Sequence, residues 1–230
     1  MNDVNKLLVI AAHPDDELLG CGGSISKYLN NGALVKVLFL GEGSTCRYDD
    51  PSCQEALAAI AQRSLWAVEA LRVIGVTDFE FCDLPCGRFD QTPIIVINKI
   101  IERVIKEFNP DTIFTHSEGD SNNDHRIAHR ATIMATRPCG EYVVRRLFCY
   151  EVLSSSEWSY TSSFLPNYFV SLTESQVLAK WKALECYATE MREHPFPRSW
   201  EGVKNLAEKR GMQAGIKFAE AFQLVREFEI

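Results

Sequence analysis

The stretch that decides the fold is residues 7–17, which read LLVIAAHPDDE. The first six residues are apolar, a length and composition typical of a strand that is buried on both faces. Residues 13–17 (HPDDE) follow without a spacer, so an imidazole and three carboxylates stand where this strand ends. Carboxylates this dense resist burial unless a positive group holds them. The pattern predicts a divalent metal, with zinc as the first choice; a solvated acidic turn that caps the next helix is the alternative.

A second segment rich in His and Asp follows another predicted strand, residues 112–116. Residues 116–129 read HSEGDSNNDHRIAH, and from Asp124 onward the composition is typical of a helix start. His125 and His129 are four residues apart and therefore share one face of that helix. Both segments would meet at the carboxyl edge of a parallel sheet, where open α/β sheets bind ligands.

The HPDDE stretch, together with Asp124-His125 downstream, resembles the PIG-L/LmbE-like zinc deacetylases, which remove N-acetyl groups from amino-sugar conjugates. The resemblance covers nearly the whole chain, with further matches at residues 20–23 (GCGG), 119–120 (GD), 124–126 (DHR), 210–211 (RG) and 219–222 (AEAF). It implies that His13, Asp16 and His125 bind one zinc ion per chain, although another divalent transition metal stays open. It also implies that Asp15 is the general base.

One position departs from this family, which commonly has His two residues before the Asp of Asp124-His125, where it helps to stabilise the oxyanion. This chain has Asn122 there. An amide donates a hydrogen bond but carries no positive charge and transfers no proton. His116, at the end of its strand, is the alternative hydrogen-bond donor to the oxyanion. Both Asn122 and His116 are therefore catalytic candidates. The oxyanion donor is therefore either Asn122 or His116. The identity of the general acid also stays open, and protonated Asp15 is the expected donor of a proton to the leaving amine.

Other residues of these loops have weaker assignments. Arg47 follows the second predicted strand and is expected to bind the substrate, with an ordinary surface arginine as the alternative. We expect Asp124 and His129 to lie behind the metal ligands and orient them, rather than to bind the metal. The glycines of residues 20–23 lack a GxGxxG or P-loop pattern and are expected to let a helix pack closely. Arg210 and Glu220 either pin the C-terminal segment or line the cleft.

Composition agrees with a soluble enzyme. The chain has 230 residues, 46% of them hydrophobic, and a net charge of −7. Nucleic-acid binding relies on clustered Lys and Arg and is not expected. No apolar run approaches the roughly 20 residues that span a bilayer, and no secretory signal pattern is present, so we expect no membrane insertion and a cytoplasmic location. The sequence leaves a homo-oligomer open.

The eight cysteines occur without any CxxC pair. Zinc-ribbon spacing is therefore absent. Several cysteines have apolar neighbours, where a thiol acts as a small hydrophobe. We expect them to be reduced and mostly buried, with a disulfide or redox role as the alternative.

Strand-like and helix-like segments alternate, which predicts one α/β domain: a Rossmann-like three-layer fold with a mostly parallel sheet and helices on both faces. Residues 1–230 form this single domain, and residues 151–230 are an extension that packs on the sheet and lines the cleft. We expect strands at residues 6–12, 34–40, 79–81, 112–116, 147–150 and 168–171. Helices are expected at 18–30, 55–74, 93–108, from 124 onward, 173–191 and 200–212, and residues 218–228 are left unassigned.

The predicted function is a zinc-dependent hydrolase that deacetylates an N-acetylated amino sugar or its nucleotide-, lipid- or aglycone-linked conjugate, releasing acetate and a free amine. Within the same fold, an amidase for thiol conjugates is an alternative. Two other classes stay open: a nucleotide-binding module without catalysis, which the missing GxGxxG opposes, and a catalytically silent metal-binding relative, which Asn122 permits.

Overall fold

The computed structural model describes residues 4–139 and 143–229. Within these ranges one sheet has the strand order β3-β2-β1-β4-β5-β7-β6. The strands are β1 (Lys6–Ala11), β2 (Leu34–Gly41), β3 (Asp78–Leu84), β4 (Thr112–His116), β5 (Arg146–Tyr150), β6 (Tyr168–Leu172) and β7 (Phe218–Glu227). The helices are α1 (Asp16–Asn30), α2 (Gln54–Ile74), α3 (Ile94–Phe108), α4 (Asn123–Ala135), α5 (Glu174–Leu184) and α6 (Trp200–Ala214).

The five strands from β1 to β5 run parallel, and β7 joins the sheet antiparallel to both β5 and β6. The strand order changes direction between β1 and β4, so the loops after these two strands lie beside each other at the carboxyl edge. Both predicted metal-binding segments belong to those loops. The predicted α/β fold with a mostly parallel sheet is confirmed.

The sequence of β1 supplies both halves of the core. Leu7, Val9 and Ala11 pack into one cluster of apolar side chains, and the residues between them pack into the other. Each residue from Leu7 to Ala12 is fully buried. The alternation follows from the two-residue period of a strand, and the absence of polar residues follows from its position in the middle of the sheet.

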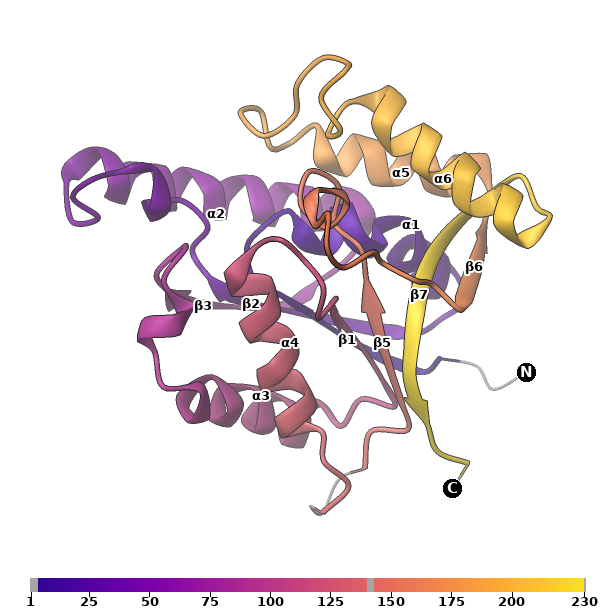
Figure 1. Cartoon of the computed structure of the whole chain (residues 1–230), viewed down its shortest axis with the longest axis horizontal. Helices are drawn as coiled ribbons and strands as arrows, with labels where there is room; N and C mark the ends of the chain where they lie inside the picture. The colour runs from indigo at the N-terminus through magenta and orange to yellow at the C-terminus, as the bar shows by residue number, and fades with distance from the viewer. Residues whose placement is uncertain (1–3, 140–142, 230) are drawn as a thin grey trace.

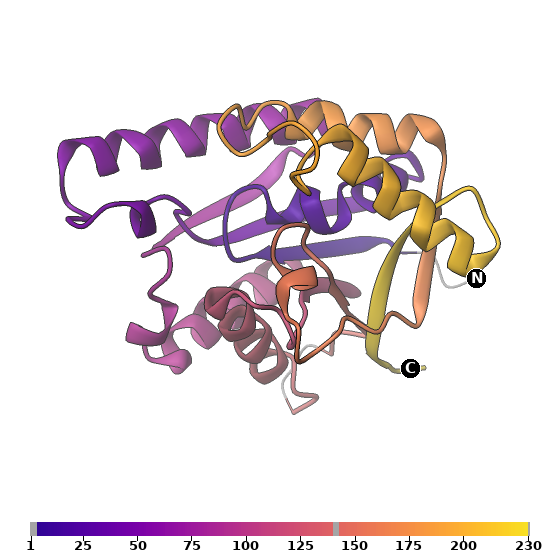
Figure 2. The ribbon, with the colours of Figure 1, turned by 45° about the horizontal axis from the view of Figure 1, so that its top comes forward.

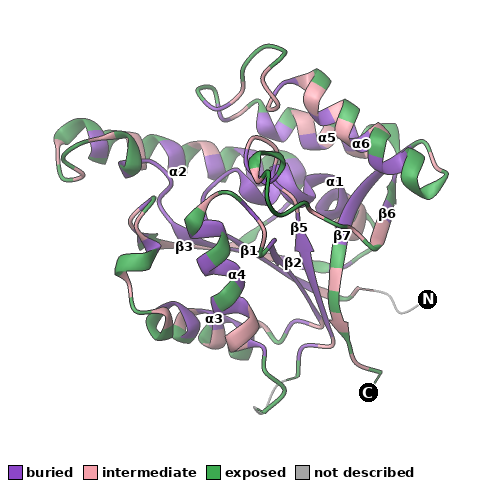
Figure 3. Cartoon of the chain, viewed as in Figure 1, coloured by how far each residue is buried: buried purple, intermediate pink, exposed green. Residues whose placement is uncertain are grey.

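Helices cover both faces of the sheet (Figures 1 and 2). α3 and α4 pack against each other on one face, while α1, α2, α5 and α6 lie on the other, where α5 contacts α1 and α2. The buried residues concentrate in the strands and on the inner faces of these helices (Figure 3). The part of the chain beyond residue 150 adds β6 and β7 to the sheet and α5 and α6 to one layer.

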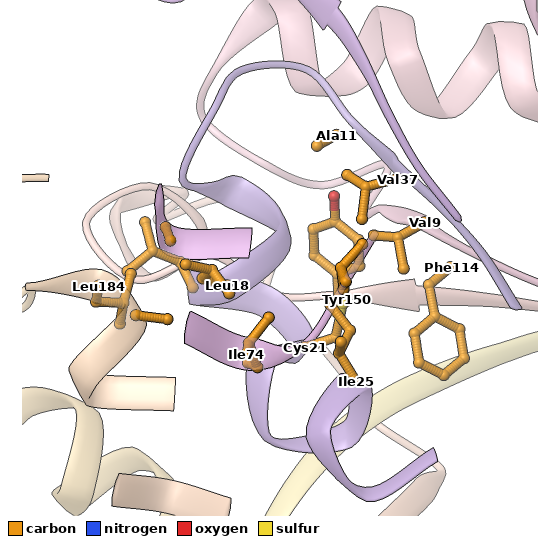
Figure 4. Close-up of a cluster of buried hydrophobic side chains, with 14 of the residues drawn as sticks. Val9, Ala11, Leu18, Cys21, Ile25, Val37, Ile74, Phe114, Tyr150 and Leu184 are labelled. Carbon is orange, nitrogen blue, oxygen red and sulfur yellow. The ribbon is translucent and has the colours of Figure 1, made fainter. Parts of the chain in front are cut away.

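The glycines near the start of α1 permit close packing, as predicted. A Cβ at Gly20 would overlap the ring of Tyr150, and a Cβ at Gly23 would crowd Leu172 and Glu220. Tyr150 is fully buried under α1 (Figure 4), and its hydroxyl donates to the carbonyl oxygen of Ile10 at 2.9 Å. The first helix can therefore lie directly on the strands that carry the site.

Two predictions of secondary structure need correction. The helix expected at residues 173–191 ends at Leu184, because the chain then turns to bury Tyr187 against Glu17 and to bring Glu190 to Arg63. The unassigned segment 218–228 contains β7, which fits between β5 and β6.

The expectation of mostly buried cysteines is also wrong. Of the eight, only Cys21, Cys86 and Cys149 are buried, while Cys46 and Cys139 are exposed. Across the part of the chain that the structure describes, no helix is both long enough and apolar enough to cross a membrane.

Candidate metal centre and active site

Three side chains with metal-ligand chemistry meet at the carboxyl edge of the sheet. His13 and Asp16 come from the loop after β1 and the first turn of α1, and His125 comes from the first turn of α4. Oδ2 of Asp16 lies 3.6 Å from Nδ1 of His13 and 3.3 Å from Nε2 of His125. One ligand atom of each residue lies within 4.8 Å of the other two, and all three residues are buried. The structure thus brings together the three residues that the resemblance implied, His13, Asp16 and His125, which we call the triad.

The donor set fits a divalent cation. Burial opposes the charged form of Asp16, but the charge of His125 and hydrogen bonds from His125 and His13 hold the pKa of Asp16 well below its usual range. Two imidazoles and one carboxylate are a donor set that binds zinc in catalytic sites, where a fourth position stays open. The acidic turn is not solvated, since Asp15, Asp16 and Glu17 are each at most 1% exposed. The alternative of a solvated helix cap is therefore wrong.

Two aspartates lie behind the histidines. Nε2 of His13 is 2.9 Å from Oδ2 of Asp124, which also accepts the N–H of Gly87 at 2.6 Å, while Oδ1 of Asp124 accepts the N–H of Phe89 at 3.1 Å. Nδ1 of His125 lies 3.2 Å from Oδ1 of Asp120. Asp124 and Asp120 thereby direct the opposite nitrogen of each ring towards Asp16. Carboxylates in this position fix the orientation of histidine ligands.

Asp120 is itself held from the C-terminal half of the chain. The hydroxyls of Ser155 and Ser156 both donate to its carboxylate, the latter at 2.6 Å. These bonds, with the neighbouring His125, hold the pKa of Asp120 at about 2 although burial would raise it. The irregular segment after residue 153 therefore supports a histidine of the triad, a role that the sequence did not indicate.

Asp15 has a strained backbone and two arginine partners. Its φ of 113° lies in the left-handed region, which residues other than glycine seldom adopt and which is often found at functional sites. Oδ2 of Asp15 is 2.8 Å from Nη2 of Arg63 and 2.7 Å from Nη1 of Arg198. Burial raises the pKa of Asp15, and the two guanidinium groups only partly offset that effect. Its Oδ1 is the oxygen that these two contacts leave for another partner.

Glu190 extends this network to Arg47. Its carboxylate accepts contacts from Arg47 at 2.8 Å, Arg63 at 2.8 Å and Arg198 at 3.4 Å. Arg47 has a half-exposed side chain, so its guanidinium lies at the rim of this group. Three guanidinium groups, from Arg47, Arg63 and Arg198, therefore surround the carboxylates of Asp15 and Glu190.

Arg63, Glu190 and Arg198 were not among the site residues predicted from the sequence. Arg63 did carry a signal, because it stands in the buried stripe of α2 with Ala56, Ala67, Ala70 and Ile74. An arginine at such a position implies a buried partner. No local pattern marked Glu190 or Arg198, which lie in the irregular segment between α5 and α6.

Asn122 and His116 occupy different environments. Asn122 caps α4, since its Oδ1 accepts the N–H of Asp124 at 2.9 Å, and only its amide nitrogen remains to donate elsewhere. His116 is fully buried, and its Nε2 accepts the N–H of Ala12 at 2.8 Å. Its ring stacks on His125 with 4.0 Å between centroids. Burial and the nearby His125 hold the pKa of His116 well below its usual range, so the ring is neutral.

Three further predicted residues lie outside the triad. Nδ1 of His129 is 3.0 Å from the carbonyl oxygen of His116, so His129 contacts the backbone behind the site. Arg210 forms an ion pair with Glu151, and Glu220 accepts the N–H groups of Gly23 and Ser24 and pairs with Lys180 at 2.7 Å. The contacts of Arg210 and Glu220 pin the C-terminal segment to β5 and α1.

Comparisons with known proteins identify the family of this chain. The model of the PIG-L family, described as GlcNAc-PI de-N-acetylase, matches residues 8–136. Diacetylchitobiose deacetylase of Thermococcus kodakarensis is 27% identical over 97% of this chain and 84% of its own length. The 1D-myo-inositol 2-acetamido-2-deoxy-alpha-D-glucopyranoside deacetylase of Geodermatophilus obscurus is 28% identical over 59% of this chain and 54% of its own length.

A solved structure shows the same fold. The N,N'-diacetylchitobiose deacetylase of Pyrococcus horikoshii superposes with a TM-score of 0.75 and 22% identity, over 97% of this chain and 84% of that one. The family match spans more than half of the chain and includes every residue of the triad. This chain therefore belongs to the PIG-L family of deacetylases, hydrolytic enzymes that act on N-acetyl amides.

Proposed function

We propose that this protein is a zinc-dependent deacetylase whose substrate is an N-acetylated amino sugar or its nucleotide-, lipid- or aglycone-linked conjugate. The observation that supports it most is the buried group of His13, Asp16 and His125 with Asp15 beside it. Relatives named as deacetylases of acetamido sugars support the substrate class.

Zinc at this triad would polarise the acetamide carbonyl and lower the pKa of a bound water. His13, Asp16 and His125 would supply its three protein ligands, and Asp124 and Asp120 would keep the two imidazoles oriented. His129 would support the site indirectly, through its contact with the backbone carbonyl of His116.

Asp15 is the proposed proton carrier. Its Oδ2 is engaged by Arg63 and Arg198, so Oδ1 is the atom that accepts a proton from water as the oxygen attacks the acetyl carbon. Cleavage of the C–N bond leaves an amine, to which Asp15 returns that proton, and acetate is the other product. Burial favours this exchange, because it moves the pKa of Asp15 upward towards neutrality.

Oxyanion stabilisation is proposed for the amide nitrogen of Asn122. His116 is the weaker candidate, because the N–H of Ala12 already occupies its Nε2 and its ring is enclosed. Preorganised donors of this kind act where charge develops in the transition state. Arg47, at the rim and held by Glu190, is proposed to bind a hydroxyl or an anionic group of the conjugate.

The proposal is tested by screening N-acetylglucosamine and its nucleotide, lipid and aglycone conjugates with a fluorescamine assay for free amine. The protein is used with one equivalent of zinc, and the metal-stripped protein and the Asp15→Asn variant serve as controls. We expect acetate and free amine to form in equal amounts with the zinc-loaded protein. Both products should be lost in the two controls. Retained zinc without turnover on any of these amides would instead identify a catalytically silent relative.

A further inference from the structure

A second group of metal-ligand side chains lies on the other side of His13. Cys86 contributes a thiol to this group, and its ligand atom lies within 4.8 Å of those of His13 and Asp124. All three residues are buried. Because Nδ1 of His13 faces Asp16 while Nε2 faces Asp124, the two groups of ligands use opposite edges of one imidazole.

A fourth donor stands beside them. Sγ of Cys46 is 3.2 Å from Sγ of Cys86, and both thiols are free. Cys46 belongs to the short helix Thr45–Arg47 after β2 and is exposed, so the group can be reached from solvent. Two sulfurs, one imidazole and one carboxylate are ligands that zinc and other thiophilic cations prefer in tetrahedral sites.

The backbone holds the two thiols in place. The carboxylate of Glu42 accepts the N–H of Cys86 at 2.7 Å and the N–H of Thr45 at 3.0 Å, which ties the two cysteine-bearing loops together. The next residue, Gly87, donates its N–H to Asp124 at 2.6 Å. The four donors therefore come from four segments, the loops after β1, β2 and β3 and the start of α4, which hydrogen-bond to one another.

We propose that Cys46, Cys86, His13 and Asp124 form a second cation site, for a thiophilic divalent ion such as Zn²⁺ or Cd²⁺. In tetrahedral zinc sites the ligand atoms are roughly 3.3 to 3.8 Å apart, given bonds of about 2.0 Å to N or O and 2.3 Å to S. The present 3.2 Å between the sulfurs would widen by roughly 0.6 Å, and the present 2.9 Å from His13 to Asp124 by roughly 0.4 Å. The ion takes the place of two thiol protons and the proton shared by His13 and Asp124, and all three protons pass to solvent.

Occupation of this site has a consequence for the neighbouring one. The ion replaces the hydrogen bond by which Asp124 orients His13. His13 is a member of the triad, so binding at the second site disturbs the first and lowers turnover. This consequence rests on the proposed function, whereas the existence of the cation site does not. A thiophilic cation present in excess would thus inhibit the protein.

The site is tested by cadmium titration of the whole protein. The chain is fully reduced, loaded with one equivalent of zinc, and titrated with CdCl₂ while the ultraviolet thiolate-to-cadmium absorption and both bound metals are measured. We expect one added cadmium, retained zinc, and an absorption that falls to about half in Cys46→Ser and in Cys86→Ser. The double variant should lose the absorption, and Cys139→Ser, which changes another exposed cysteine, should keep it.

Three results would overturn the proposal: no cadmium bound beyond the zinc, cadmium that replaces zinc one for one, or an absorption that survives in the double variant. Circular dichroism and retained zinc establish that each variant is folded. The titration contains no substrate, so it stands even if the deacetylase proposal fails. The inhibitory effect is measured separately, as the ratio of turnover with and without a second equivalent of zinc. That ratio should fall in the wild type and stay near one in the double variant, and an unchanged ratio in the wild type would contradict the inhibition.

Discussion

Arg198 contacts Asp15 across 183 residues of sequence, with Nη1 of the guanidinium 2.7 Å from Oδ2 of the carboxylate. The same guanidinium donates from Nε to the hydroxyl of Ser154 at 2.5 Å and reaches Glu190 at 3.4 Å. A residue from the irregular segment between α5 and α6 thereby becomes part of the environment of the proposed general base. The last third of the chain therefore contributes charged groups to the site.

Removal of Arg198 should shift the pH dependence of the reaction. Burial raises the pKa of Asp15 and Arg198 lowers it, so Arg198→Ala leaves burial less opposed and moves that pKa further upward. The base must be ionised to act, and the acidic limb of the kcat/KM profile should therefore move to higher pH. The control is Arg192→Ala, because the guanidinium of Arg192 lies over the ring of Phe196. An acidic limb that stays in place in Arg198→Ala would separate this residue from Asp15.

The two histidines of α4 should differ in their effect on metal binding. His125→Ala removes a proposed ligand and should strip most of the zinc, whereas His129→Ala should leave most of it, because Nδ1 of His129 faces the backbone carbonyl of His116 and the thiol of Cys149 instead of the triad. Elemental analysis of the two purified variants measures the difference. The reverse order would refute the ligand assignment.

Zinc binding should strengthen as the pH rises. Burial disfavours the charged form of His125, but Asp16 and Asp120 raise its pKa to about 10 in the metal-free protein. The ring is therefore protonated near neutrality, and zinc must displace that proton. We expect the apparent affinity to rise about tenfold per pH unit between about pH 6 and pH 8, as measured by competition with a chelator.

The raised pKa of His125 has the opposite pH dependence for the stability of the metal-free protein, which should decrease as the pH rises. A raised histidine pKa stabilises the folded state fully below the unfolded pKa of about 6.5, and this stabilisation is lost as the pH rises through about 10. Metal-free protein should thus lose stability over this window while zinc binding improves. An affinity for zinc that does not change with pH would contradict the proton displacement.

Asn122 and His116 can be separated by single substitutions. If the amide of Asn122 donates to the oxyanion, Asn122→Ala should lower kcat by ~100-fold, or roughly 3 kcal/mol, with little change in KM. His116→Ala should affect folding more than kcat per folded molecule, because its ring is enclosed between Ala12 and His125. A larger loss of kcat in folded His116→Ala would move the oxyanion role to His116. Asn122→His shows whether the usual family residue raises activity in this site.

The sequence predicted every strand except β7 because the signals of the other strands are local. Residues 7–12 are apolar on both faces of a strand, and β4 was placed at its observed residues by the breaker Asn109-Pro110 before it and the polar loop after it. The triad was implied by the family resemblance, which the motifs in the same two loops carry. Boundaries failed where burial of distant partners decided them, as at the end of α5, where Tyr187 and Glu190 turn inward.

The rest of the site depends on contacts between distant parts of the chain. Arg198 meets Asp15 only after α5 and α6 have packed on the sheet, and Ser155 meets Asp120 only after β5 lies beside β4. Their own neighbours in sequence carry no sign of these roles. Arg63 is the exception, since a charged residue in the buried stripe of α2 could have been recognised from its spacing.

The most direct test of the central claim is the zinc content and turnover of Asp15→Asn measured together. The substitution keeps the size and polarity of the side chain but removes the base, while the ligands His13, Asp16 and His125 remain. We expect about one zinc per chain, as in the wild type, and a kcat lower by at least ~100-fold on the substrate found in the screen. Near-normal turnover by the zinc-loaded variant would contradict the account and remove Asp15 from the mechanism.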